Sequence, residues 1–220
     1  MRKKGSTFFN IIIGISIIAL IAAIGYALYY YISNYIAVKE AEEAVEEFER
    51  KVTIIALDDE VENVVQEGQN AEEEEEISQS SSTRKSTTYY KNYVMVGTIQ
   101  IPRTGVKAPI VDRVTPSSIV SAVGVLYGPG LNEKGNTVLA AHNYRNGTFF
   151  SNNKKLEEGD LIYITDSDGD CQEYTVYNTY ITAAEDFSYA TRNTNGKREI
   201  SLSTCTTDAS TRLVIWARES

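Results

Sequence analysis

The sequence predicts a mostly β domain, closed or nearly closed, that follows a membrane-spanning helix and an acidic stalk. An uncharged run of 25 residues lies near the N-terminus, and nearly all of the net charge of −9 falls in the segment after it. The last 132 residues contain short runs rich in Val, Ile and Tyr, separated by Gly, Pro and Asn. This pattern is typical of strands joined by short connections.

The first segment, residues 1–37, has the length and composition of a membrane anchor. No side chain from Phe8 to Ile32 is charged, and about 20 helical residues suffice to cross a hydrocarbon layer of about 30 Å. A cleaved signal peptide has a shorter apolar region of about 7 to 15 residues, so we favour an uncleaved anchor. Basic residues at Arg2 to Lys4 favour a cytoplasmic N-terminus. We therefore expect a single-pass protein of the cell membrane, with the rest of the chain outside the cell.

Residues 38–88 form the predicted stalk, with sixteen acidic and five basic side chains. Apolar residues at heptad-like spacing predict an amphipathic helix over 38–57; they are Ala41, Val45, Phe48, Val52 and Ile55. Two heptads are too few for a coiled coil, so a helix lying on its own domain or on the membrane is at least as well supported as dimerisation. Glu72–Glu76 and the Ser/Thr-rich residues 77–88 predict a flexible tether.

The third segment, residues 89–220, is nearly neutral and long enough to bury about two thirds of its unfolded surface around one core. We expect it to fold as a separate domain. Its predicted strands are 93–101, 106–111, 136–142, 160–165, 172–182, 198–204 and 212–218. The sequence Thr-Pro-Ser-Ser at 115–118 predicts one short helix that ends at Gly124.

Composition and motifs exclude several classes of function. One His and two Cys exclude a multi-site zinc protein and a disulfide-dense scaffold. The negative charge argues against a nucleic-acid binder. The sequence contains no phosphate-binding glycine loop and no cluster of metal ligands, so we predict no cofactor and no metal. Asp166–Asp170 superficially resembles a calcium loop, but Cys171 and Tyr177 occupy the positions of its Gly and Glu, so we predict a hairpin turn.

Two residues near the C-terminus form a candidate reactive pair. Side chains alternate between two faces along the predicted strand 198–204. Cys205, directly after it, points away from the face formed by Ile200 and Leu202. Arg212 opens the next predicted strand after six connecting residues, so an antiparallel hairpin places it beside Cys205. A guanidinium fixed beside a thiol stabilises the thiolate.

The only histidine, His142, ends the predicted strand 136–142. A thiol, an imidazole and a guanidinium at strand ends are the groups that thiol acyl transfer needs, because Cys205 attacks, His142 moves the proton and Arg212 holds the developing oxyanion. Each residue also has an ordinary structural interpretation. The histidine fits a hydrogen-bonded loop residue, the arginine fits a solvent-facing side chain, and the cysteine fits a disulfide with Cys171.

Leu202 to Cys205 read Leu-Ser-Thr-Cys, and with Arg212 they resemble the Leu-x-Thr-Cys and downstream Arg signature of the sortases. Sortases are membrane-anchored cysteine transpeptidases of Gram-positive bacteria. The resemblance extends upstream through four further segments in order, which are Val96–Pro102, Pro109–Ile110, Gly135–Asn143 and Leu156–Ile164. One departure is Ala141, where many members have Gly before the histidine.

The resemblance implies a closed eight-stranded β-barrel of the sortase type. It implies Cys205 as nucleophile, His142 as general acid/base and Arg212 as stabiliser of the substrate and oxyanion. The implied substrates are secreted proteins with a C-terminal sorting signal of the Leu-Pro-x-Thr-Gly kind, and the implied acceptor is an amine on a peptidoglycan precursor or a pilin. Features of class B and of classes A and D both occur. A membrane-anchored cysteine protease that releases its product to water, and a non-catalytic extracellular β domain, stay open as alternatives.

Overall fold

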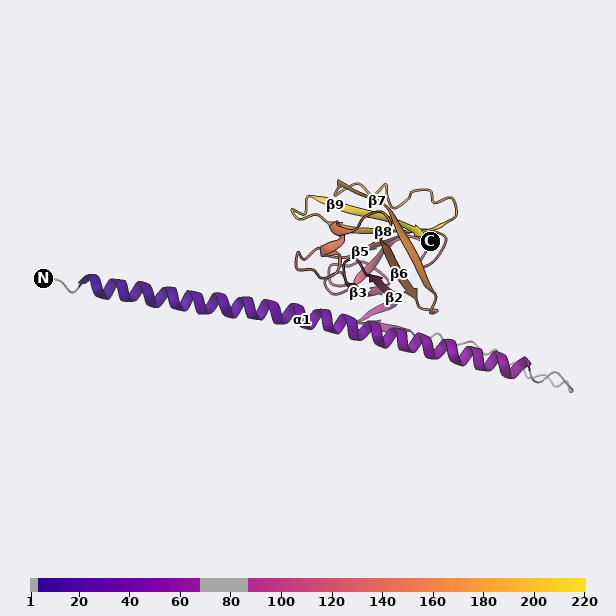
Figure 1. Ribbon diagram of the computed structural model, residues 1–220, viewed down its shortest axis with the longest axis horizontal. Coiled ribbons are helices and arrows are strands. Elements are labelled where there is room, and N and C mark those ends of the chain that lie inside the picture. The colour runs from indigo at the N-terminus through magenta and orange to yellow at the C-terminus, as the bar shows by residue number, and fades with distance from the viewer. Residues whose placement is uncertain (1–3, 68–86) are drawn as a thin grey trace. The chain divides into compact units, whose positions relative to one another are not determined.

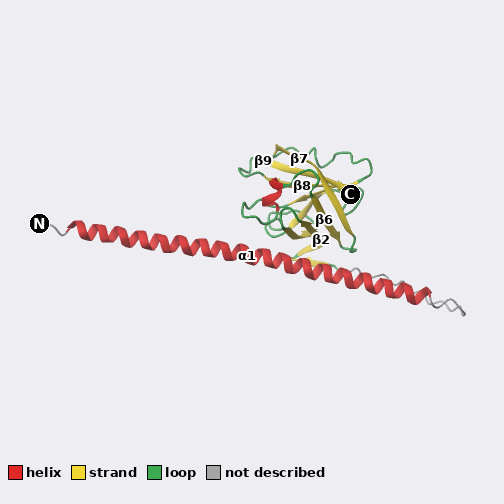
Figure 2. Cartoon of the chain, in the orientation of Figure 1, coloured by secondary structure: helices red, strands yellow, loops and turns green. Residues whose placement is uncertain are grey.

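The computed structural model describes residues 4–67 and 87–220 of the chain. Contacts divide the chain into two compact units, Met1–Glu40 and Ala41–Ser220. The helix α1 (Lys4–Glu67) contributes residues to both units, and every strand belongs to the second (Figure 1). Figure 2 shows the part of the second unit that follows α1 as strands joined by loops, with one short helical segment.

The first unit consists of the apolar part of α1. Among the described residues, one helix, α1, is long and apolar enough to cross a membrane. The mean hydropathy of its most apolar stretch of 18 residues is 2.7. No residue of that stretch is buried; for example, Ile18 is 69% exposed and Ile21 is 64% exposed. A continuous helix covered with exposed aliphatic side chains is suited to lipid, which supports the predicted anchor. The predicted orientation stays a prediction.

The second unit contains a closed barrel of eight strands. The strands of the unit are β1 (Thr88–Tyr90), β2 (Tyr93–Ile101), β3 (Val106–Val111), β4 (Val123–Tyr127), β5 (Gly135–Ala140), β6 (Leu161–Asp166), β7 (Cys171–Ala183), β8 (Arg198–Cys205) and β9 (Thr211–Glu219). Their order is β1-β2-β3-β4-β5-β8-β9-β7-β6, and pairing of β2 with β6 closes the barrel. The strand β1 extends the sheet outside the ring by pairing with β2. The predicted closed eight-stranded fold is confirmed.

Most neighbouring strands are antiparallel, but two pairs are parallel. These are β3 with β4 and β5 with β8. The parallel pair β5 and β8 is the one that matters for the site, because the carboxyl ends of parallel strands meet at the same edge of a sheet. Aliphatic side chains that point inward fill the barrel, and among them Ile99, Leu139, Ile164, Leu202 and Ile215 are each at most 1% exposed.

The amphipathic part of α1 packs on the barrel. Val45, Phe48 and Val52 form an apolar cluster with residues of the barrel, among them Met95 and Val111. Of the interpretations for the predicted amphipathic helix, packing on its own domain is therefore the one observed. Contacts join this part of the helix to the barrel in the second unit. The predicted boundary at residue 88 thus stays a prediction about independent folding. Residues 72–86 of the predicted tether lie outside the described residues, and Thr88, its last residue, begins β1.

Four elements differ from the sequence-based expectation. The predicted helix that begins at Thr115 is a series of turns. Thr115 Oγ1 accepts a hydrogen bond from the backbone N–H of Ser118 at 2.9 Å, as a helix cap does, but the chain enters β4 at Val123. Gly124, predicted to end the helix, lies in this strand. The short strands β1 and β4 and the 3-10 helix η1 (Phe150–Lys155) are not predicted by the sequence.

Candidate active site

The hairpin of β8 and β9 brings two of the predicted site residues together. Cys205 and Arg212 are direct register partners across the antiparallel pair, where Cβ atoms are typically about 4.5 to 5.5 Å apart. Both side chains are half-buried. The loop between them is tied by a hydrogen bond from the Thr206 N–H to the Thr211 carbonyl at 3.1 Å. The predicted hairpin placement of Arg212 beside Cys205 is therefore observed in the strand register.

His142 lies at the same end of the barrel. Two hydrogen bonds join its segment to the end of β8: Thr204 Oγ1 donates to the Ala141 carbonyl at 2.8 Å, and Asn143 Nδ2 donates to the Cys205 carbonyl at 3.0 Å. Because these bonds involve the residues on both sides of His142, they hold its backbone next to Cys205. The last paired residues of β5 and β8, which are Ala140 and Ser203, show the same register. The fold thus gathers all three predicted residues at one edge of the barrel.

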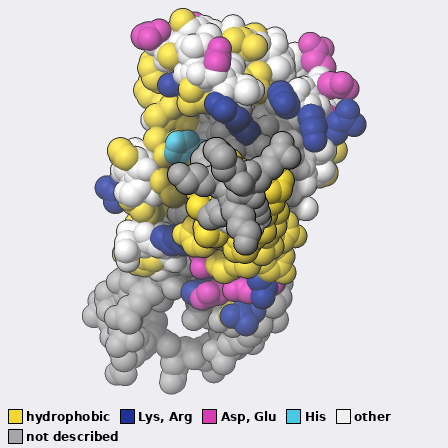
Figure 3. All heavy atoms as spheres, turned by 90° about the vertical axis from the view of Figure 1, so that its left-hand side faces the viewer, with side chains coloured by type: hydrophobic (Ala, Val, Ile, Leu, Met, Phe, Trp, Pro, Cys, Tyr) yellow, Lys and Arg dark blue, Asp and Glu magenta, His cyan; other side chains and the backbone are white. Residues whose placement is uncertain are grey.

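The imidazole of His142 packs against an aromatic side chain. Its ring centroid is 4.9 Å from that of Tyr144, whose hydroxyl donates to the Val120 carbonyl at 2.8 Å. Partial burial disfavours the charged imidazolium and lowers the pKa of His142 from its usual value. The ring still reaches the surface, where it is the one cyan group in Figure 3. A partly exposed imidazole that is neutral near pH 7 can accept a proton.

The outer face of β8 carries a polar network that sequence reasoning did not find. Arg192, in the β7–β8 loop, forms an ion pair with Glu199 at 2.6 Å, and each side chain is only 11% exposed. The guanidinium lies 4.8 Å from the ring centroid of Trp216 and donates to Ser201 Oγ at 3.2 Å. The hydroxyls of Tyr189, in the same loop, and Ser203 lie 3.1 Å apart, within hydrogen-bond distance.

This network holds the loop over the outer face of β8, the face to which Cys205 belongs by strand alternation. The signal in the sequence is the alternation of two serines with Ile200 and Leu202. Polar side chains on a strand buried on both faces require partners, and here the loop supplies them.

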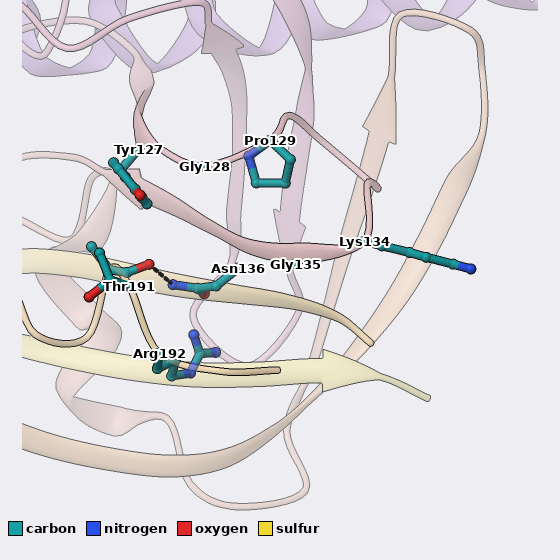
Figure 4. A pocket seen from close by; sticks show the side chains of 9 residues that line it. Tyr127, Gly128, Pro129, Lys134, Gly135, Asn136, Thr191 and Arg192 are labelled. Carbon is teal, nitrogen blue, oxygen red and sulfur yellow. Dashed lines mark hydrogen bonds between the residues drawn. The ribbon is translucent and has the colours of Figure 1, made fainter. Parts of the chain in front are cut away.

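A pocket of about 650 Å³ lies under the same loop but away from Cys205. It is lined by Tyr127, Gly128, Pro129, Lys134, Gly135, Asn136, Ala190, Thr191 and Arg192. Figure 4 shows Asn136, whose amide donates to the Ala190 carbonyl at 3.1 Å, and Lys134, which extends away from Arg192. Gly135 opens β5 and pairs with Arg198 of β8. Arg198 lies seven residues before Cys205 in that strand. At about 3.3 Å per residue this is roughly 23 Å along the strand, so the pocket is not part of the candidate active site.

The second cysteine stands apart. Cys171 is exposed, opens β7 opposite Thr165, and is a free thiol, as is Cys205. The disulfide interpretation therefore does not describe this structure. The predicted hairpin turn before Cys171 is confirmed, because Asp166 Oδ1 accepts the backbone N–H groups of Asp168 at 2.9 Å and Asp170 at 3.1 Å. Within residues 4–67 and 87–220, no three His, Cys, Asp or Glu side chains form a group that suits a metal ion.

Comparisons with known proteins agree with this geometry. Sortase A from Bacillus anthracis is 31% identical over 124 residues, which cover 55% of this chain and 58% of that protein. Sortase A from Corynebacterium diphtheriae is 28% identical, with a TM-score of 0.53 over 58% of this chain and 61% of that one. A sortase D5 transpeptidase from Clostridium perfringens is 26% identical, with a TM-score of 0.52 over 57% of this chain and 79% of that one.

A sortase C2 from a Group B Streptococcus pilus island is 26% identical, with a TM-score of 0.53 over 57% of this chain and 74% of that one. The similar structures therefore include sortases of classes A, C and D, so the subclass stays unassigned. This chain spans less than two thirds of the length of the first two relatives. The sortase domain family matches residues 99–220, more than half of the chain. The chain belongs to the sortase family.

Proposed function

We propose that this protein is a membrane-anchored cysteine transpeptidase. It cleaves a C-terminal sorting signal of a secreted protein and joins the new carboxyl end to an amine. The observation that carries the proposal is the meeting of Cys205, Arg212 and the segment of His142 at one edge of the barrel. Membership of the sortase family supports the same reaction.

The proposed reaction begins with the Cys205 thiol. Its proton passes to neutral His142, and the thiolate attacks the scissile carbonyl carbon. Arg212 donates hydrogen bonds to the oxyanion that forms, and its fixed positive charge stabilises the tetrahedral intermediate. His142 then protonates the leaving amine, the C–N bond breaks, and a thioester remains on Cys205. An acceptor amine attacks this thioester, a new C–N bond forms, the C–S bond breaks, and the proton of the amine returns to sulfur through His142.

The partners follow from the same proposal. The donor is a secreted protein with a sorting signal of the Leu-Pro-x-Thr-Gly kind or a variant, and the acceptor is an amine of a peptidoglycan precursor or a pilin. The apolar part of α1 anchors the enzyme in the cell membrane, with residues 1–4 in the cytoplasm and the barrel outside. Protease added to intact protoplasts should therefore release a fragment that contains the barrel. A fully protected chain would contradict this orientation.

The test of the function uses the full-length chain in detergent with a pooled library of sorting-signal peptides. Intact mass spectrometry should show an acyl adduct on the protein, and addition of an amine acceptor should convert the adduct into an amide product. The variant Cys205→Ala should form no adduct, while the matched variant Cys171→Ala should form it. Release of the acyl group to water alone, with an acceptor present, would favour a cysteine protease. The lack of any adduct would favour a non-catalytic domain.

A further inference from the structure

A small second cavity is lined by residues from the two segments that carry the proposed nucleophile and base. Its volume is about 110 Å³, and it is lined by Asn143, Arg145, Ser151, Asn152, Lys154 and Thr207. Asn143 also donates its amide hydrogen bond to the Cys205 carbonyl, and Thr207 lies two residues beyond Cys205. The cavity thus lies between η1 with its preceding loop and the β8–β9 loop; it is lined by the chain neighbour of His142, and neither His142 nor Cys205 lines it.

The lining of this cavity is positively charged. Arg145 and Lys154 contribute two cations, and no acidic residue lines the cavity. The guanidinium of Arg145 donates to the Thr207 carbonyl, which holds it against the β8–β9 loop. Neither cation takes part in any ion pair found in the described part of the chain. Two unpaired cations at one small cavity create a local preference for an anion.

A buried hydroxyl at the same cavity has no partner. Ser151 is 5% exposed, and within residues 4–67 and 87–220 its Oγ makes no hydrogen bond. A buried hydroxyl without a partner destabilises the folded state. The Oγ is enclosed by protein, so it can donate to an anionic oxygen in the cavity only if the Ser151 side chain turns toward the cavity on binding.

We propose that this cavity binds a carboxylate of the amine acceptor and thereby directs the amine toward the thioester on Cys205. The inference rests on the proposed transpeptidase function and deepens it. The volume is that of three or four water molecules at about 30 Å³ each, which suits a carboxylate with one or two attached carbons. The acceptor class is then an amine with a carboxylate a few atoms away, as at the end of an amino acid or short peptide. A lysine side chain in a protein, which has no such carboxylate, is the disfavoured acceptor.

The test compares acceptors that differ only in this charge. The full-length chain in detergent is given a sorting-signal peptide as donor, with glycine or glycylglycine as acceptor, each compared with its amide. We expect KM for the better carboxylate acceptor to be roughly tenfold lower than KM for its amide, the size of one charge-assisted contact. The variant Lys154→Gln should remove most of this difference. The neighbouring exposed lysine does not line the cavity, so Lys155→Gln is the matched control and should keep the preference.

A second variant separates binding from folding. Ser151→Ala removes a hydroxyl that has no partner, so the melting temperature should be unchanged or higher. At the same time KM for the carboxylate acceptor should rise roughly threefold or more. A fall in melting temperature with no change in this KM would contradict the proposal, because the hydroxyl would then have only a structural role.

Thioester formation without acceptor, read by intact mass, reports the proposed function independently of the cavity. A wild-type thioester together with equal KM for acid and amide acceptors would overturn the carboxylate site and leave the transpeptidase proposal standing. If Lys154→Gln instead raises KM only for donor peptides that carry Glu in place of Gln, the carboxylate that the cavity binds belongs to the donor. The assignment to the acceptor is then wrong. The lack of any thioester would overturn both proposals.

Discussion

Phe48 offers the sharpest test of how the helix and the barrel depend on each other. Its side chain is 2% exposed and belongs to the cluster that α1 forms with Met95 and Val111. Replacing a buried Phe by Ala costs about 3 to 5 kcal/mol. Ala is the better helix former by roughly 0.5 kcal/mol, which offsets a small part of the loss. The expected net destabilisation of Phe48→Ala is about 3 kcal/mol.

The sole tryptophan makes this effect measurable in the barrel itself. Trp216 lies in β9 and packs against the cluster of Val138, Tyr189 and Val214, so its fluorescence reports unfolding of the barrel. For a unit of about this size, 1 kcal/mol corresponds to about 2 to 4 °C, so the barrel should melt about 6 to 12 °C lower in the Phe48→Ala variant, measured for the full chain in detergent.

The matched control is an exposed residue on the same helix. Ile54 is 51% exposed, so Ile54→Ala should leave the melting temperature within about 2 °C, as expected for a surface change. If Phe48→Ala behaves like Ile54→Ala, the helix does not stabilise the barrel and the predicted boundary at residue 88 gains support. With the expected loss, a chain that begins at residue 89 should still fold around the main core but melt well below the full-length protein.

Three further predictions concern the chemistry. Cys205→Ala should abolish the acyl adduct in intact mass spectra, whereas Cys171→Ala, which removes an exposed thiol, should form it at nearly the wild-type rate. Arg212→Lys keeps the charge but loses the planar fork, so steady-state kinetics should show kcat reduced on the order of 10²- to 10³-fold, and a change in KM alone would refute the oxyanion role. Burial lowers the pKa of His142, and only the neutral ring accepts a proton, so the rate of thioester formation should fall on the acid side with a midpoint below about 6.5. A midpoint above that value would contradict this assignment.

Much of the fold follows from local patterns in the sequence. The seven predicted strands correspond to β2, β3 and β5 to β9, because each has a run of β-branched and aromatic residues bounded by turn residues. The strand β4 is missed because it is only five residues long and contains Gly124, while the cap-like contact at Thr115 imitates a helix start. Local patterns also cannot show which sheet edges pair, so the nine-strand order required the structure.

The candidate site also combines features that local sequence patterns predict with features that they do not. The pairing of Cys205 with Arg212 follows from a hairpin with a short loop, which is a local feature. The network around Arg192 and Glu199 does not follow from local features, because a charged residue in a loop, such as Arg192, is normally solvent-exposed. Its burial depends on the tertiary contact of the β7–β8 loop with Trp216 and with the outer face of β8.

The placement of His142 depends on a feature that local sequence patterns do not contain. His142 and Cys205 are 63 residues apart in the sequence. His142 follows the carboxyl end of β5, and Cys205 is the last residue of β8. Had β5 and β8 paired antiparallel, as most neighbours in this barrel do, the two residues would lie at opposite ends of the strands. Parallel pairing, with Ala140 opposite Ser203, brings them to one edge. The hydrogen bonds of Asn143 and Thr204 then fix this register at the point where the ladder ends, so these two residues position the candidate site.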